Sequence, residues 1–179
     1  VFTHTWSLGV EEQFYMLFPF LIWFSGFGRQ TKNGTRNLFP IVGVLTIISL
    51  IGFLYINKSN QPAAYFLMPT RFWEMAAGSL VFLLIKRESS ILKKLYSFPD
   101  YIALIFILLT FFVDKSFGMY STILMVILTS ILIVCINKKS IVFLLLTKKT
   151  FSYLGKISYS LYLWHWPILT ISRWTIGIY

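Results

Sequence analysis

Residues 38–56 read LFPIVGVLTIISLIGFLYI, an apolar run without a charged side chain. A helix rises about 1.5 Å per residue, so this run is long enough to cross the ~30 Å hydrocarbon core of a bilayer. Similar apolar runs occupy residues 5–27, 66–85, 101–113, 120–136 and 154–176. Only residues 101–113 are short for a crossing. We therefore predict an all-α, polytopic integral membrane helix bundle with about six transmembrane helices.

The composition agrees with this prediction. Of the 179 residues 57% are hydrophobic and only 12% are charged, whereas soluble domains carry about twice that charged fraction. The formal charge of +10 would suit nucleic acid, but the Lys and Arg residues lie between apolar runs rather than on one face, so we expect no nucleic-acid partner. The one cysteine, Cys135, lies in an apolar run, and no metal site is expected. The chain starts at Val1 without a signal peptide, and we interpret it as a piece of a longer protein.

The basic residues indicate an orientation. Connections after the first, third and fifth apolar runs hold eleven Lys and Arg residues, whereas the second and fourth connections, counted together with Arg71 at the start of the third run, hold three. The positive-inside rule places the richer set in the cytoplasm, so residues 5–27 and 66–85 both run from outside to inside. The apolar stretch 141–147, between two pairs of lysines, is too short to cross and is expected as an interfacial turn.

The first motif, HTWSLGVEEQFY, occupies residues 4–15. At 100° per residue, His4, Ser7 and Glu11 fall within roughly a third of the helix circumference. Ionisable groups inside a spanning helix are costly unless they face a polar interior, so this stripe is expected to line a cavity. The alternative is that Glu11 and Glu12 lie at the membrane interface and are solvated.

The second motif, PTRFWEMAAG, occupies residues 69–78 and leads into the third apolar run from outside. Arg71 and Glu74 are spaced i,i+3, which allows a direct ion pair. This pair either neutralises two charges near the membrane boundary or faces the same cavity as Glu11.

The third motif, LGKISYSLYLWHWP, occupies residues 154–167 and places Ser158, Tyr162 and His165 on one helix face. An aromatic belt at the interface would explain the neighbouring tryptophans. It does not explain His165, which lies roughly 16 Å in from the cytoplasmic edge.

The three motifs are predicted to lie at similar depths in the bilayer. Glu11 and Glu74 each lie roughly 10 Å in from the outer end of their helices, so with His165 they approach the midplane of the bilayer. We predict that these three side chains converge on one polar cavity.

In this order, the three motifs resemble the signatures of the acyltransferase-3 family, specifically its bacterial glycan O-acetyltransferase branch. The resemblance implies that residues 1–179 are a partial domain covering the fourth to ninth of about ten spans. The family's catalytic histidine, the last span and the extracytoplasmic hydrolase-like domain of some members would lie outside it. It also implies a multi-pass protein of the bacterial cytoplasmic (inner) membrane.

The function implied by this resemblance is transfer of an acyl group, usually acetyl, from a cytoplasmic acyl-CoA to a hydroxyl of a cell-surface or envelope glycan, such as a polysaccharide or lipopolysaccharide. The partners would be the acetyl-CoA donor substrate, the glycan acceptor and membrane lipid, with no bound cofactor. The reaction needs a base and donors for the developing oxyanion. The candidate catalytic residues of this chain are Glu11, His165 and His4. The candidate substrate-binding residues are Ser7, Trp6, Arg71, Glu74, Tyr162 and Ser158.

Two other readings remain open. Ionisable residues at the midplane are equally expected of a proton-coupled transporter, although the two halves of the chain show no internal similarity. The chain could also be a non-catalytic remnant of the acyltransferase. Without the family's histidine, the chain is expected to have little activity by itself.

Overall fold

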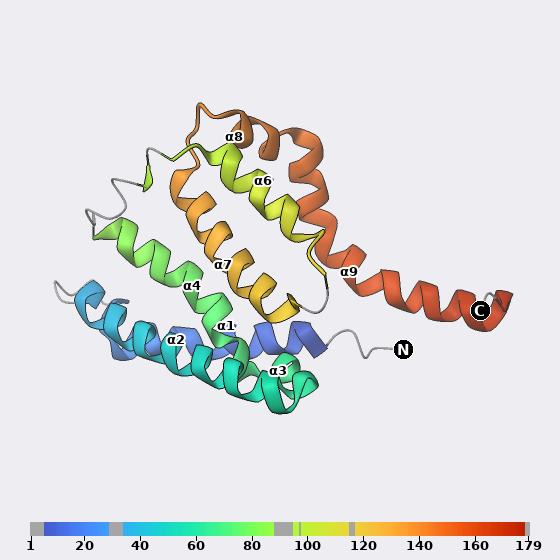
Figure 1. Ribbon diagram of the computed structural model, residues 1–179, viewed down its shortest axis with the longest axis horizontal. Helices are drawn as coiled ribbons and strands as arrows, with labels where there is room; N and C mark the ends of the chain where they lie inside the picture. Colours follow the sequence, from blue (N-terminus) through green and yellow to red (C-terminus); the bar gives the residue numbers. More distant parts are fainter. Residues whose placement is uncertain (1–5, 29–33, 88–94, 97, 115–116, 178–179) are drawn as a thin grey trace.

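The computed structural model describes residues 6–28, 34–87, 95–96, 98–114 and 117–177. Throughout this part the regular secondary structure is helical, as predicted (Figure 1). The elements are α1 (Trp6–Phe24), α2 (Gly34–Ser59), α3 (Gln61–Phe66), α4 (Met68–Lys86), α6 (Asp100–Thr110), α7 (Gly118–Cys135), α8 (Ile141–Leu146) and α9 (Lys149–Ile176). The long helices lie on the predicted apolar runs. The predicted interfacial turn is instead the short helix α8, and α3 was not predicted.

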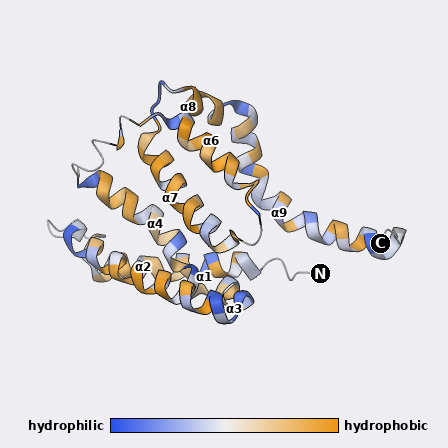
Figure 2. Ribbon diagram, viewed as in Figure 1, coloured by the Kyte–Doolittle hydropathy of each residue, from blue (hydrophilic) through white to orange (hydrophobic). Residues whose placement is uncertain are grey.

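Two of the described helices, α2 and α7, are long and apolar enough to cross a membrane. Only 17% of the apolar window of α2 and 11% of that of α7 are buried, whereas a core helix of a soluble protein would be mostly buried. Figure 2 shows hydrophobic residues along both helices. By the same measure of length and hydropathy, α6 is too short to cross a membrane, and α1, α4 and α9 are not candidate spans. Length and hydropathy alone therefore support fewer spans than the six predicted.

Helix α4 is the centre of the packing. It contacts α2 over most of its length, and it also contacts α1 and α7. The largest buried cluster joins these first helices through Phe14 of α1, Val42 of α2 and Phe72 of α4. A second cluster joins Phe53 of α2 and Trp73 of α4 to the beginning of α7.

The helix directions alternate along the bundle. Helix α2 is antiparallel to α4, because Leu38 packs with Leu83, near the start of one helix and the end of the other. Helix α7 runs parallel to α4, since its end contributes Val134 to a cluster with Val81. Helix α6 is antiparallel to α7, with which it shares a cluster anchored by Ala103. This alternation is the pattern that successive membrane crossings require.

A tight corner connects α3 to α4. Asn60 caps α3 by accepting a hydrogen bond from the amide of Ala63 at 3.1 Å, and Pro62 and Pro69 lie in the first turns of α3 and α4. The hydroxyl of Thr70, which is 2% exposed, donates to a carbonyl oxygen of α3 at 2.7 Å. The corner therefore fixes where α4 begins.

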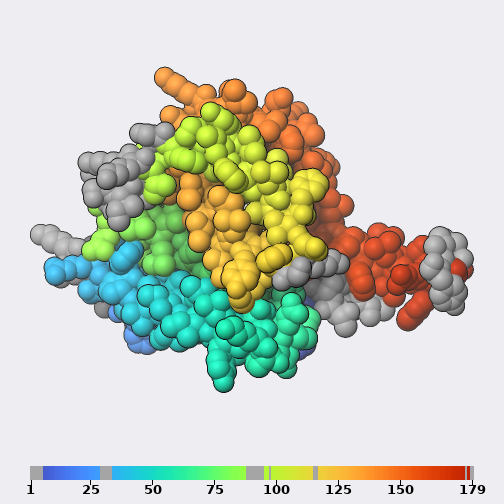
Figure 3. Space-filling view, viewed as in Figure 1, coloured from blue at the N-terminus to red at the C-terminus, as the bar shows by residue number. Residues whose placement is uncertain are grey.

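Helix α9 lies apart from this core. Its main contact is with α8, and the buried hydrophobic clusters of the described residues take no side chain from it. Figures 1 and 3 show it projecting from the remaining helices.

Candidate functional site

The beginnings of α1 and α4 meet at one end of the bundle. Arg71 donates hydrogen bonds from Nε and Nη2 to Oε2 of Glu74, both at 3.2 Å, which confirms the predicted ion pair. Its Nη1 donates to Oγ of Ser7 on α1, also at 3.2 Å. The guanidinium therefore connects two of the three sequence motifs.

Aromatic side chains hold this end together. The ring of Tyr65 lies 5.1 Å from Cζ of Arg71, within the range of a cation–π interaction. Trp6 donates from Nε1 to the backbone oxygen of Phe66 at 3.0 Å, so it satisfies a carbonyl at the end of α3. The residues that surround the guanidinium, which we call the Arg71 cluster, are Ser7, Tyr65, Arg71 and Glu74.

The ion pair of the Arg71 cluster is largely shielded from solvent. The side chains of Arg71 and Glu74 are 17% and 18% exposed. Both bonds from Arg71 end on Oε2, so Oε1 of Glu74 has no hydrogen-bond donor among the described residues. Ser7 accepts from Arg71, and its own proton has no acceptor in the same part of the chain. One carboxylate oxygen and one hydroxyl proton are thus available to a hydroxyl-bearing ligand.

The remaining candidates on the first motif lie outside this cluster. Glu11 is half-buried one turn beyond Ser7, and it makes no hydrogen bond or ion pair with a described residue. Glu12 is exposed, which agrees with the alternative that its carboxylate is solvated. His4 lies outside the described residues.

The candidates of the third motif all lie on α9. Ser158 is exposed and donates to the backbone oxygen of Gly155 in its own helix at 2.8 Å. Nδ1 of His165 lies 2.7 Å from the backbone oxygen of Tyr162, and the two rings are 5.7 Å apart. A carbonyl can only accept, so this hydrogen bond requires the proton to be on Nδ1.

The structure thus brings Ser7, Arg71 and Glu74 together and holds the α9 residues on a separate helix. The convergence of Glu11, Glu74 and His165 on one cavity stays a prediction.

Sequence reasoning missed two supports of the site. Ser49 of α2, 6% exposed, donates to the backbone oxygen of Pro69 at 2.6 Å and accepts from the amide of Trp73 at 3.0 Å. These two groups lie on either side of Arg71 on α4. Tyr65 was missed because the chain turns between it and Arg71, so helical spacing does not relate them.

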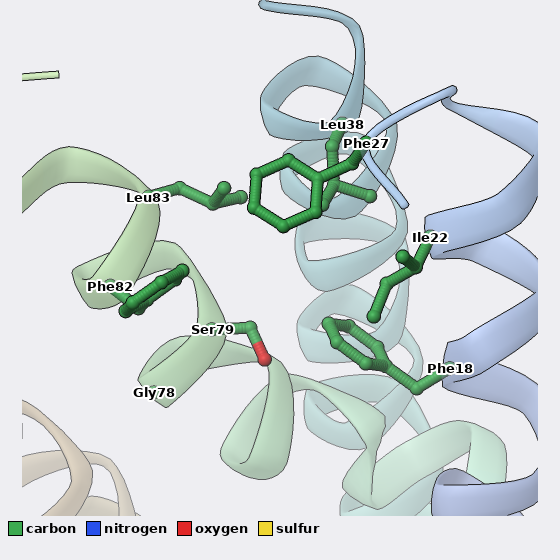
Figure 4. Close-up of a pocket in the computed structure, with 8 residues that line it drawn as sticks. All are labelled: Phe18, Ile22, Phe27, Leu38, Gly78, Ser79, Phe82 and Leu83. Carbon is green, nitrogen blue, oxygen red and sulfur yellow. The ribbon is translucent and has the colours of Figure 1, made fainter. Parts of the chain in front are cut away.

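An apolar cavity lies between α1, α2 and the C-terminal half of α4, away from the Arg71 cluster (Figure 4). It has a volume of about 260 Å³ and is lined by Phe18, Ile22, Phe27, Leu38, Gly78, Ser79, Phe82 and Leu83. Ser79 contributes the one hydroxyl of this lining. Its surface therefore suits an apolar group rather than a charged one.

Comparison with known protein families identifies the family of this chain. The family described as an acyltransferase domain matches residues 1–179. The chain belongs to the acyltransferase-3 family. Its relatives include the O-acetyltransferase OatA of Staphylococcus aureus (strain NCTC 8325 / PS 47), which is 31% identical over an alignment of 179 positions that covers 93% of this chain and 29% of the relative. The putative peptidoglycan O-acetyltransferase YrhL of Bacillus subtilis (strain 168) is 30% identical over an alignment of 182 positions that covers 93% of this chain and 28% of the relative.

This acyltransferase-3 chain therefore spans less than a third of the length of those relatives. No solved structure matches it.

Proposed function

We propose that this chain is part of a membrane O-acyltransferase that moves an acyl group, acetyl by preference, onto a hydroxyl of a cell-envelope glycan. The observation that carries the proposal is the family match over residues 1–179, together with two relatives whose names describe O-acetyltransferases. Because YrhL is named for peptidoglycan, peptidoglycan is the first acceptor to test. The donor is a cytoplasmic acyl-CoA, and no resident cofactor takes part.

In this proposal α1, α2, α4, α6, α7 and α9 are spans of a multi-pass protein in the bacterial inner membrane, with α6 the shortest of them. The alternating helix directions support it, as do the exposed apolar faces of α2 and α7. The positive-inside count requires α1 and α4 to begin on the same side, and the contact between Ser7 and Arg71 agrees with that requirement. Further spans and the family's catalytic histidine belong to the part of the protein outside residues 1–179.

The Arg71 cluster acts on the acceptor side. By the positive-inside count it lies at the extracytoplasmic end, where an envelope glycan is presented. The unpartnered Oε1 of Glu74 accepts a hydrogen bond from a sugar hydroxyl, and the proton of Ser7 is donated to a sugar oxygen. Arg71 holds both groups in place, and Trp6 and Tyr65 offer aromatic faces to the sugar.

Transfer requires the acceptor hydroxyl to lose its proton as it attacks the acyl carbonyl, the developing oxyanion to be stabilised, and the C–S bond to CoA to break, with the leaving thiolate taking up a proton. Glu11 orients or tunes the imidazole that serves as base, and His165 and His4 are the alternative bases within this chain. Tyr162 and Ser158 contribute hydrogen bonds from α9.

The test is O-acetylation of envelope glycan by the full-length protein. Peptidoglycan is purified from cells that express it and from a strain that lacks the gene, and acetate released by mild base is measured. Labelled acetyl-CoA is then supplied to inside-out and right-side-out membrane vesicles, and transfer is expected only when the donor reaches the cytoplasmic face. Equal acetate in both strains refutes the proposed acceptor, and transfer in right-side-out vesicles alone refutes the donor side.

A matched pair of variants tests the site. Ser7→Ala removes the group that binds the sugar, whereas the control, Ser59→Ala, removes a hydroxyl that bonds only the backbone of its own helix and should leave the activity unchanged. We expect Ser7→Ala to lower kcat/KM by roughly two- to tenfold, since a hydrogen bond between neutral groups contributes about 0.5–1.5 kcal/mol. Equal activity of Ser7→Ala and wild type would remove Ser7 from the acceptor site.

A further inference from the structure

A polar groove lies where α8 ends and α9 begins. It has a volume of about 540 Å³ and is lined by Thr147, Lys149, Thr150, Ser152, Tyr153 and Lys156. Two lysines and four hydroxyl-bearing residues thus contribute to the lining, which includes no carboxylate, and the hydroxyl of Thr147 already donates to the backbone of Phe143. Lysine and hydroxyl donors are the groups that hold a phosphate.

The lining follows one face of α9. Lys149, Tyr153 and Lys156 are spaced i, i+4 and i+7, so they form a stripe about two turns long. Both lysines are exposed, and neither is paired with a carboxylate in the part of the chain that the structure describes. Their positive charge is therefore uncompensated, and an anionic ligand would supply the missing partner.

The surface beside the groove is apolar. Helix α8 is anchored through Val142, which is 3% exposed in a cluster with Ala103 of α6. Its ends are fixed by the side chains of Ser140 and Thr147, which bond to the backbone of Phe143. In contrast, Ile141 is 83% and Leu144 57% exposed. A ligand that matches both surfaces has an anionic head and hydrocarbon chains.

We propose that this groove binds the headgroup of an anionic phospholipid, whose acyl chains lie along the exposed side of α8. A free phosphate or a soluble nucleotide would use the lysines but not the adjoining apolar surface. The positive-inside count places this end of the bundle at the cytoplasmic leaflet, which carries the negative surface potential. The inference does not depend on the transferase activity.

The experiment measures lipid binding to the full-length protein in mild detergent by native mass spectrometry. Phosphatidylglycerol and phosphatidylcholine of equal chain length are titrated against wild type and Lys149→Ser/Lys156→Ser. The control, Lys138→Ser/Lys139→Ser, removes the same charge just before α8, outside the groove lining. We expect wild type to prefer phosphatidylglycerol. Each lysine near a membrane surface contributes about 1 kcal/mol, so the groove variant should lose roughly thirtyfold in affinity for this lipid, and the control only a few-fold.

Two further arms separate the possible ligands. Leu144→Ser should weaken binding of phosphatidylglycerol, because it removes apolar surface beside the groove, while leaving competition by glycerol phosphate unchanged. Equal losses in the groove variant and the control would show diffuse attraction to charge and overturn the proposal. It would also be overturned if inorganic phosphate or glycerol phosphate bound as tightly as the lipid.

Discussion

Removing the Arg71–Glu74 ion pair one partner at a time separates its structural role from its functional one. Arg71→Met leaves the carboxylate of Glu74, 18% exposed, without its counter-ion. Breaking a largely buried pair in this way costs about 3–5 kcal/mol, whereas replacing both partners by apolar groups of similar volume is close to neutral. We therefore expect Arg71→Met to be destabilised by about 3 kcal/mol. Arg71→Met/Glu74→Met should return to within about 1 kcal/mol of wild type.

Two assays on the full-length protein are needed. Unfolding in mixed detergent micelles gives the free energy of each variant, and labelled acetyl transfer to glycan gives its activity. If the Arg71 cluster binds the acceptor, the double variant recovers stability but not activity. If it recovers both, the pair only neutralises two charges near the membrane boundary, and the acceptor-site reasoning is refuted.

Three other substitutions test the supports around this site. Ser49→Ala removes two hydrogen bonds to α4, each worth about 0.6–1.7 kcal/mol between membrane helices, so the free energy of unfolding should fall by about 1–3 kcal/mol. The control is Thr46→Ala, which removes only a bond to its own helix. An equal effect of the two substitutions would contradict the bridge from Ser49 to α4. Asn60→Ala removes the cap of α3 and should lower stability by about 1 kcal/mol, measured in the same micelles; no change would mean that the cap is dispensable. Gly78 lines the apolar cavity, and an added Cβ there meets no atom within 4 Å, so Gly78→Leu should unfold at the same or a higher temperature. A lower unfolding temperature would mean that the position does not accommodate the larger side chain.

The positions of the long helices could be predicted from the sequence because hydrophobic runs are local. The Arg71–Glu74 pair could be predicted for the same reason, since i,i+3 spacing is a property of one helix. Helix α3 could have been found from Asn60 followed by Pro62, a cap and a first-turn proline, but its six residues were too short for a hydropathy signal.

The contacts between elements could not be predicted in this way. The bonds of Ser7 with Arg71 and of Ser49 with α4 join residues 64 and 20–24 positions apart, and their geometry depends on the corner at Leu67. Hydropathy also could not indicate that α9 packs mainly on α8, because hydropathy reports how apolar a helix is and not which helix it contacts.

The Ser49 bridge also determines the vertical register between α2 and α4. Its hydroxyl bonds to Pro69 and Trp73, two residues before and after Arg71, so sliding α4 by one residue, about 1.5 Å, would break both bonds. The position of the guanidinium along the bundle is therefore set by a hydroxyl on a neighbouring helix. Homologues that shift this charge toward or away from the surface should carry a compensating relocation of that hydroxyl along α2.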